Sequence, residues 1–153
     1  MNFREAVIPW IIPLVDPGLK YDATKKMMAR YYKESRLYRN YDHYSGDDLF
    51  YGTYRGVHLK FSRLLTEHCT KGDKSTEYHD IFRGIFFVVE FNKEFHSLTL
   101  VKPDKIEGTL GRGISSFFQK IDTSQPGKLI RMENPEFEKA FVITTTDEVE
   151  ARY

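Results

Sequence analysis

The chain has 153 residues, which predicts one domain spanning residues 1–153. Apolar residues make up 41% of it and charged residues 29%, a balance typical of a globular protein and not of a disordered one. Lys and Arg number 23 against 22 for Asp and Glu, so the net charge is +1 and the sequence disfavours nucleic acid as a partner.

The N-terminal stretch is strongly apolar. The run "AVIPWIIPLV", residues 6–15, is too short to span a bilayer core of about 30 Å and is interrupted by proline. Apolar residues at helical spacing from Phe3 to Leu14 predict a short helix. Trp10 is a candidate ligand-binding residue, because an apolar helix of this kind lies either in the core or in a docking patch.

A second helix is predicted from Ala23 to Tyr38, with Asp22 as its N-cap. Tyr31 and Tyr38 lie on the face that is expected to pack against a sheet. Aromatic and basic residues alternate in this segment, which also suits stacking on single-stranded nucleic acid. The neutral charge balance favours the packing role.

Strands are predicted from Asp47 onward. A hairpin over residues 47–65 should turn at Arg55 and Gly56, because apolar and polar residues alternate on its second arm. The next run is apolar at both odd and even positions from Ile85 to Val89, which predicts a central strand covered on both faces.

Further strands are predicted at residues 97–103, 128–133 and 137–146, where Asn134 and Pro135 form a turn between the last two. A long connection before them should contain a short helix at residues 114–121. Helices followed by strands indicate the α+β class: two N-terminal helices packed on a mostly antiparallel, strongly twisted sheet of about five or six strands.

One loop is a candidate anion site. The segment "GTLGRG" contains glycines whose backbone amides could hold a phosphate, with an arginine beside them. The candidate ligand-binding residues of this loop are Gly108, Gly111, Arg112 and Gly113. A flexible turn is the competing interpretation, since no strand precedes the glycines as a phosphate loop requires.

Carboxylates offer a second candidate chemistry. Asp47 and Asp48, or Glu133 and Glu136, could bind a divalent cation if a further oxygen ligand joined them. A turn leading into a strand explains Asp47 and Asp48 equally well. The single cysteine, Cys69, lacks the surroundings of a nucleophile, and the sequence predicts no catalytic residue, metal site or cofactor.

Five segments resemble, in order, the uncharacterised bacterial domain of unknown function family 3137. They are "PLVDPGLKYD", "YKESRLY", "YSGDDLFYGTYRGVHLKFS", "IFRGIFFVVEFNKEF" and "ENPEFEKAFVITTTDEVEARY". Two positions depart from the family pattern: Arg63 stands where an acidic residue is expected, and Ser97 where glycine is expected.

The resemblance implies a trimmed core of a longer protein whose membrane helices lie outside this chain. Residues 147–153 would then be the first turn of a helix. The family brings no activity, cofactor or catalytic residue.

Two functions follow as hypotheses. The favoured one is a non-catalytic binding module on the cytoplasmic side of a bacterial membrane-associated protein, with a protein or small ligand as its partner. The alternative is a hydrolase-like enzyme, with or without a divalent metal, that uses the carboxylates named above.

Overall fold

The computed structural model describes residues 3–38, 41–72, 75–103 and 127–152. The chain divides into two compact units, Met1–Asn92 and Lys93–Tyr153, and each is described by itself. The expectation of one domain over the whole chain stays a prediction.

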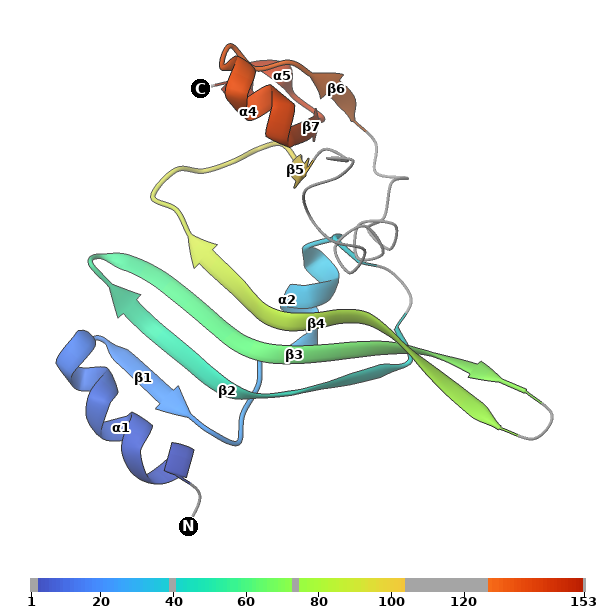
Figure 1. The fold of residues 1–153 in the computed structure, drawn as a ribbon. Helices are drawn as coiled ribbons and strands as arrows, with labels where there is room; N and C mark the ends of the chain where they lie inside the picture. The colour runs from blue at the N-terminus through green and yellow to red at the C-terminus, as the bar shows by residue number, and fades with distance from the viewer. Residues whose placement is uncertain (1–2, 39–40, 73–74, 104–126, 153) are drawn as a thin grey trace. The chain divides into compact units, whose positions relative to one another are not determined.

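The larger unit contains a four-stranded antiparallel sheet in the order β1-β2-β3-β4, so each strand pairs with its neighbour in sequence (Figure 1). Its elements are α1 (Phe3–Val15), β1 (Leu19–Asp22), α2 (Ala29–Glu34), β2 (His43–Tyr54), β3 (Val57–Lys71) and β4 (Thr76–Glu90). The α+β class and the antiparallel pairing are therefore confirmed. The strands of the described residues belong to two sheets, of four and three strands, where a single sheet was expected.

The predicted hairpin is confirmed as β2 and β3, which turn at Arg55 and Gly56. Both turn residues have positive φ, 50° and 83°, as a tight hairpin turn requires. β3 and β4 continue as a two-stranded ribbon beyond His43, where β2 begins, and this ribbon is visible in Figure 1.

The prediction that β4 is central and covered on both faces is wrong. Among the described residues β4 lies at the end of the sheet order, with β3 as its single strand partner. Phe82 and Phe86 are buried on one face, whereas Ile85 and Phe87 on the other are 59% and 57% exposed. The apolar run is thus an edge strand with one bare face.

The first predicted helix is confirmed in position, but none of its residues is buried. The second is shorter than expected, because Asp22 ends β1 and its side chain accepts the Thr24 amide in a local turn. Residues 23–28 then cross to α2 as extended chain and turns. Only Tyr32 of α2 is buried, so packing of both N-terminal helices on the sheet is not what the structure shows.

The core of the larger unit lies between α2 and one face of the sheet. Tyr32 is fully buried, and its ring meets those of Tyr38, Phe82 and Phe86 at centroid distances of 5.3–6.1 Å. Its hydroxyl hydrogen-bonds the buried Thr66 hydroxyl at 2.8 Å. The aromatic core expected from composition is therefore built around one tyrosine, although Tyr31 and not Tyr32 was predicted to face the sheet.

The smaller unit has a three-stranded antiparallel sheet in the order β5-β7-β6. Its elements are β5 (Thr99–Pro103), β6 (Lys128–Ile130), α4 (Pro135–Ala140), β7 (Phe141–Thr145) and α5 (Glu148–Arg152). Leu100, Ile130 and Ile143 are its buried apolar side chains among the described residues.

Helices α4 and α5 of the smaller unit each begin at a side chain that accepts backbone N–H groups. The Asn134 side chain accepts the amides of Glu136 and Phe137, so Asn134 caps α4 and the predicted turn into a longer strand is wrong. The expected helical turn after β7 is confirmed as α5, where Asp147 accepts the amides of Val149 and Glu150. The Glu150 carboxylate in turn accepts the amides that lead into β5.

Candidate functional site

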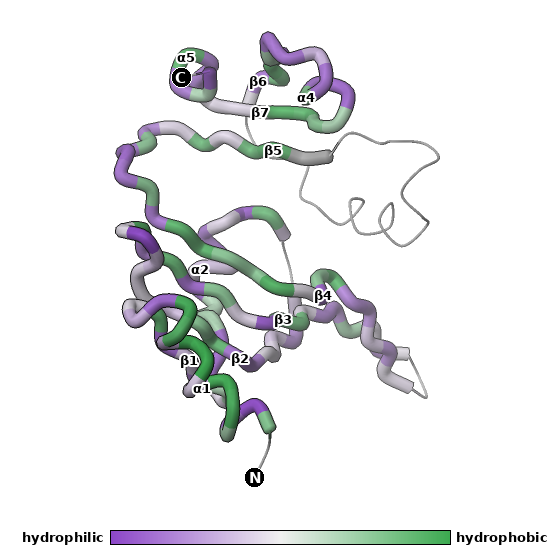
Figure 2. The backbone as a smooth tube through the Cα atoms, turned by 60° about the vertical axis from the view of Figure 1, so that its left-hand side comes forward, coloured by the Kyte–Doolittle hydropathy of each residue, from purple (hydrophilic) through white to green (hydrophobic). Residues whose placement is uncertain are grey.

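Helix α1 exposes an unusual amount of apolar surface. Trp10 is 80% exposed, Leu14 85% and Phe3 71%. Figure 2 shows α1 as hydrophobic along most of its length. A helix that is apolar on its outward side normally has a further partner, which makes α1 a candidate binding surface.

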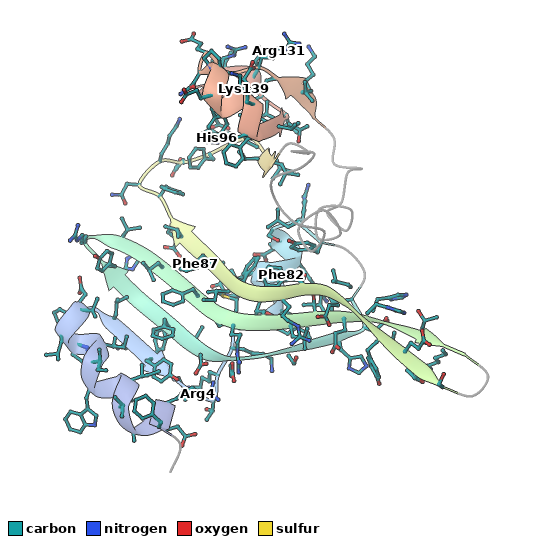
Figure 3. All side chains as sticks on the ribbon, viewed as in Figure 1. Arg4, Phe82, Phe87, His96, Arg131 and Lys139 are labelled. Atoms are coloured by element: carbon teal, nitrogen blue, oxygen red, sulfur yellow. The ribbon has the colours of Figure 1, made fainter. Side chains whose placement is uncertain are left out.

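An ionic cluster fixes the start of α1 to the sheet. Arg4 Nη1 donates to Asp47 Oδ2 at 3.0 Å and to Asp48 Oδ2 at 2.6 Å. Arg63 Nε donates to Asp47 Oδ1 at 2.7 Å, and the Tyr21 hydroxyl donates to Asp48 Oδ1 at 2.5 Å. The cluster therefore joins α1, β1, β2 and β3, with Arg4 at the helix end (Figure 3).

A bulge in β2 makes this cluster possible. The register with β3 shifts between Asp47 and Phe50, and Asp48 has a left-handed backbone with φ of 55°. Aspartate adopts this conformation more readily than most residues do. Because of the bulge, two consecutive carboxylates that would alternate across a regular strand both reach Arg4.

Within the cluster, the pKa of Asp47 is lowered and the pKa of Tyr21 is raised. Hydrogen bonding from Arg63, with a further bond from Arg4, lowers the pKa of Asp47. Burial, together with the hydrogen bond to Asp48, raises the pKa of Tyr21 to about 12. Asp47 is therefore held ionised and Tyr21 held neutral at ordinary pH.

This geometry does not favour the divalent-metal hypothesis for Asp47 and Asp48. Every carboxylate oxygen of the pair accepts a hydrogen bond from Arg4, Arg63 or Tyr21. Two guanidinium groups supply the positive charge that a cation would otherwise bring. Arg63 is one of those two groups, and Arg4 is the other.

An aromatic ladder crosses the same face of the sheet. Tyr21, Phe50, Phe61 and Phe87 are directly paired residues on β1, β2, β3 and β4. Successive ring centroids are 4.7, 4.5 and 4.7 Å apart. Phe61 lies two residues from Arg63 on β3, so the ladder and the ionic cluster share one face.

The structure does not describe the loop that was predicted as a candidate anion site. Gly108, Gly111, Arg112 and Gly113 lie outside the described residues, as does the helix predicted at 114–121. Cys69 is a free thiol on β3, and its amide donates to Asp42.

Glu133 and Glu136 belong to the smaller unit. Glu133 borders a hollow of about 310 Å³, and Glu136 lies in the first turn of α4. The other described residues that line the hollow are Met132, Asn134, Phe137 and Arg152. Asn134 is occupied in capping α4, and Arg152 pairs with Glu148 at 2.9 Å.

Sequence reasoning identified Trp10 and the acidic pair but missed Arg4, Tyr21 and Arg63. Arg4 and Asp48 are separated by 44 positions, and no local spacing links them. The sequence did contain a signal for the aromatic ladder. A two-residue hairpin turn at Arg55 and Gly56 places Phe61 directly opposite Phe50, where the bulge ends.

The fold and the site define an α+β chain whose candidate surface is an apolar helix fixed beside an antiparallel sheet. Residues 80–153 match the model of a family described as "Protein of unknown function (DUF3137)", which confirms the resemblance to that family over this part of the chain. Neither a curated protein nor a solved structure matches the chain. Helix α1 and the ionic cluster precede the matched residues, so the family adds nothing about them.

Proposed function

We propose that this chain is a non-catalytic binding module of a bacterial membrane-associated protein, and that it docks on a lipid bilayer through α1. The observation that carries the proposal is the exposure of Trp10, Leu14 and Phe3 on a helix whose start is fixed to the sheet. We also propose that the module lies on the cytoplasmic side of the membrane. The single cysteine supports this, because it cannot form an intrachain disulfide.

The dimensions of α1 favour a position in the membrane interface. Its 13 residues extend about 20 Å, less than a bilayer core of about 30 Å. None of the helices in the described part of the chain is long and apolar enough to cross a membrane. Tryptophan is enriched at the lipid headgroup level, because its ring is apolar and its N–H is polar.

The two prolines of α1 also favour a position in the membrane interface. Pro9 and Pro13 have no N–H to donate to the carbonyls of Glu5 and Pro9, four residues earlier. An unpaired carbonyl is costly in hydrocarbon but can bind water among the headgroups. A helix with such carbonyls therefore suits the interface better than the bilayer centre.

Trp10 is the chain's single tryptophan, so its fluorescence reports on α1 alone. We expect its emission to shift to the blue with phosphatidylcholine vesicles, and brominated acyl chains to quench it. Vesicles that also contain phosphatidylglycerol should bind similarly and resist salt, because the exposed surface of α1 is apolar.

A pair of matched variants tests the surface. Leu14 on α1 and Leu129 on β6 are 85% and 66% exposed. Leu14→Asp should abolish co-sedimentation with vesicles, whereas Leu129→Asp should leave it intact. Unchanged Trp10 emission with both kinds of vesicle would overturn the proposal, and so would equal loss of binding in the two variants.

A further inference from the structure

Strand β4 has the properties of an open pairing edge. Among the described residues it has one strand partner, so its other side presents backbone N–H and C=O groups. The segment "GIFFVV", residues 84–89, contains no charge and no proline, the two usual protections of an edge. The opposite edge, β1, has only four residues and includes Lys20.

We propose that two copies of this chain form a dimer in which their β4 strands pair antiparallel about Phe87. This inference is independent of lipid docking by α1. The two four-stranded sheets would become one continuous sheet, and the backbone groups of each β4 that have no strand partner in the described part of the chain would bond to the other copy.

The side chains of β4 are self-complementary in this register. Phe87 meets Phe87 of the second copy, so the aromatic ladder continues from one sheet into the next. Ile85 lies opposite Val89, and both are exposed, 59% and 38%. Their apolar area would leave water on pairing.

Charge distinguishes this register from those centred on Arg83 and on Ile85. Centring on Phe87 sets Glu90 opposite Gly84 and Arg83 opposite Phe91, so no like charges meet. Centring on Arg83 would set that arginine against its own copy. Centring on Ile85 would set Asp80 against Glu90.

Sedimentation equilibrium of the full chain at micromolar concentrations tests the assembly. We expect a dimer that Leu14→Asp does not dissociate. A monomer throughout would overturn the proposal, as would a dimer that is lost with Leu14→Asp, because that result would assign association to α1.

Charge substitutions at Ile85 and Val89 test the register. In the double variant I85K/V89K like charges meet twice across the dimer, and we expect a monomer. I85K/V89E differs from it at one position only and sets lysine opposite glutamate twice, so the dimer should return. Circular dichroism of both variants checks that each is folded. If both are dimeric, or both monomeric while folded, the proposed register is wrong.

A cross-link supplies a readout that does not depend on affinity. In a Cys69→Ser background, Phe87→Cys places two thiols directly opposite each other, with Cα atoms about 4.5–5.5 Å apart. Mild oxidation should then yield a covalent dimer. Ile85→Cys should not cross-link, because its counterpart lies about 13 Å further along the strand. Equal cross-linking of the two variants would overturn the pairing about Phe87.

Discussion

Arg4 Nη1 lies 2.6 Å from Asp48 Oδ2, and this ion pair ties the first turn of α1 to a bulge in β2. The Asp48 side chain is 19% exposed and that of Arg4 is 37% exposed, so solvent partly screens the attraction. The pair therefore positions α1 more than it stabilises the sheet.

Substitutions at Asp48 should separate charge from backbone conformation. Asp48→Asn removes the charge but tolerates the left-handed backbone, and we expect a loss of about 1 kcal/mol in the free energy of unfolding. Asp48→Ala should lose about 1–2 kcal/mol more, because alanine is strained at φ of 55°. Urea unfolding followed by circular dichroism measures both; equal losses would show that the backbone makes no contribution.

Alkaline pH should destabilise the larger unit. The pKa of an unfolded tyrosine is about 10, whereas burial raises the pKa of Tyr21 and of Tyr32 to about 12 in the folded state. Between these values the unfolded chain loses protons that the folded chain retains, so the free energy of unfolding falls as pH rises. Urea unfolding at stepped pH measures the slope.

Two phenylalanine variants check the sign of this effect. Tyr21→Phe should make the alkaline loss shallower. Hydrogen bonding from Lys60 lowers the pKa of Tyr31, so Tyr31→Phe should make the loss steeper. Slopes that change in the same direction in both variants would contradict the assignment.

The buried hydrogen bond between Tyr32 and Thr66 should behave as a coupled pair. Both side chains are fully buried, and Tyr32→Phe leaves the Thr66 hydroxyl without this partner, at a cost of about 1–3 kcal/mol. Thr66→Val should cost a similar amount. The double variant should lose less than the sum of the two, by about 1 kcal/mol, as measured by urea unfolding. Additive losses would mean that the bond contributes nothing.

Two glycines with positive φ should differ sharply on substitution. At Gly52, with φ of 138°, an added Cβ would lie 2.1 Å from the Gly18 carbonyl oxygen, so Gly52→Ala should lose about 3 kcal/mol or more, or fail to fold. At Gly56, with φ of 83°, nothing lies within 4 Å, and Gly56→Ala should cost about 1–2 kcal/mol. Thermal unfolding compares them, and similar melting temperatures would exclude the close approach of β1 to β2.

The sequence predicted the hairpin of β2 and β3 well, because alternation and a turn glycine are local signals. It failed on β4, where continuous apolar character is typical of a covered strand but here marks a bare face with Ile85 and Phe87 exposed. It also failed on α4, since an asparagine followed by proline suits a turn and a helix cap equally.

The candidate site was predictable only in part. Trp10 and the acidic pair stood out by residue type, but the role of the pair depends on Arg4 and Arg63, which the fold brings in from other elements. Whether Asp47 and Asp48 bind a metal or a guanidinium group is decided by the bulge, which no local pattern in β2 revealed.

The meander of β1 to β4 has a kinetic consequence. Each of its strands pairs with the next one in the chain, and the β2–β3 and β3–β4 pairings close short loops that should form early in folding. In the smaller sheet β5 pairs with β7, so Thr99 cannot pair until the chain has been synthesised as far as Thr145. During synthesis the larger sheet can therefore assemble while the smaller one still lacks its middle strand.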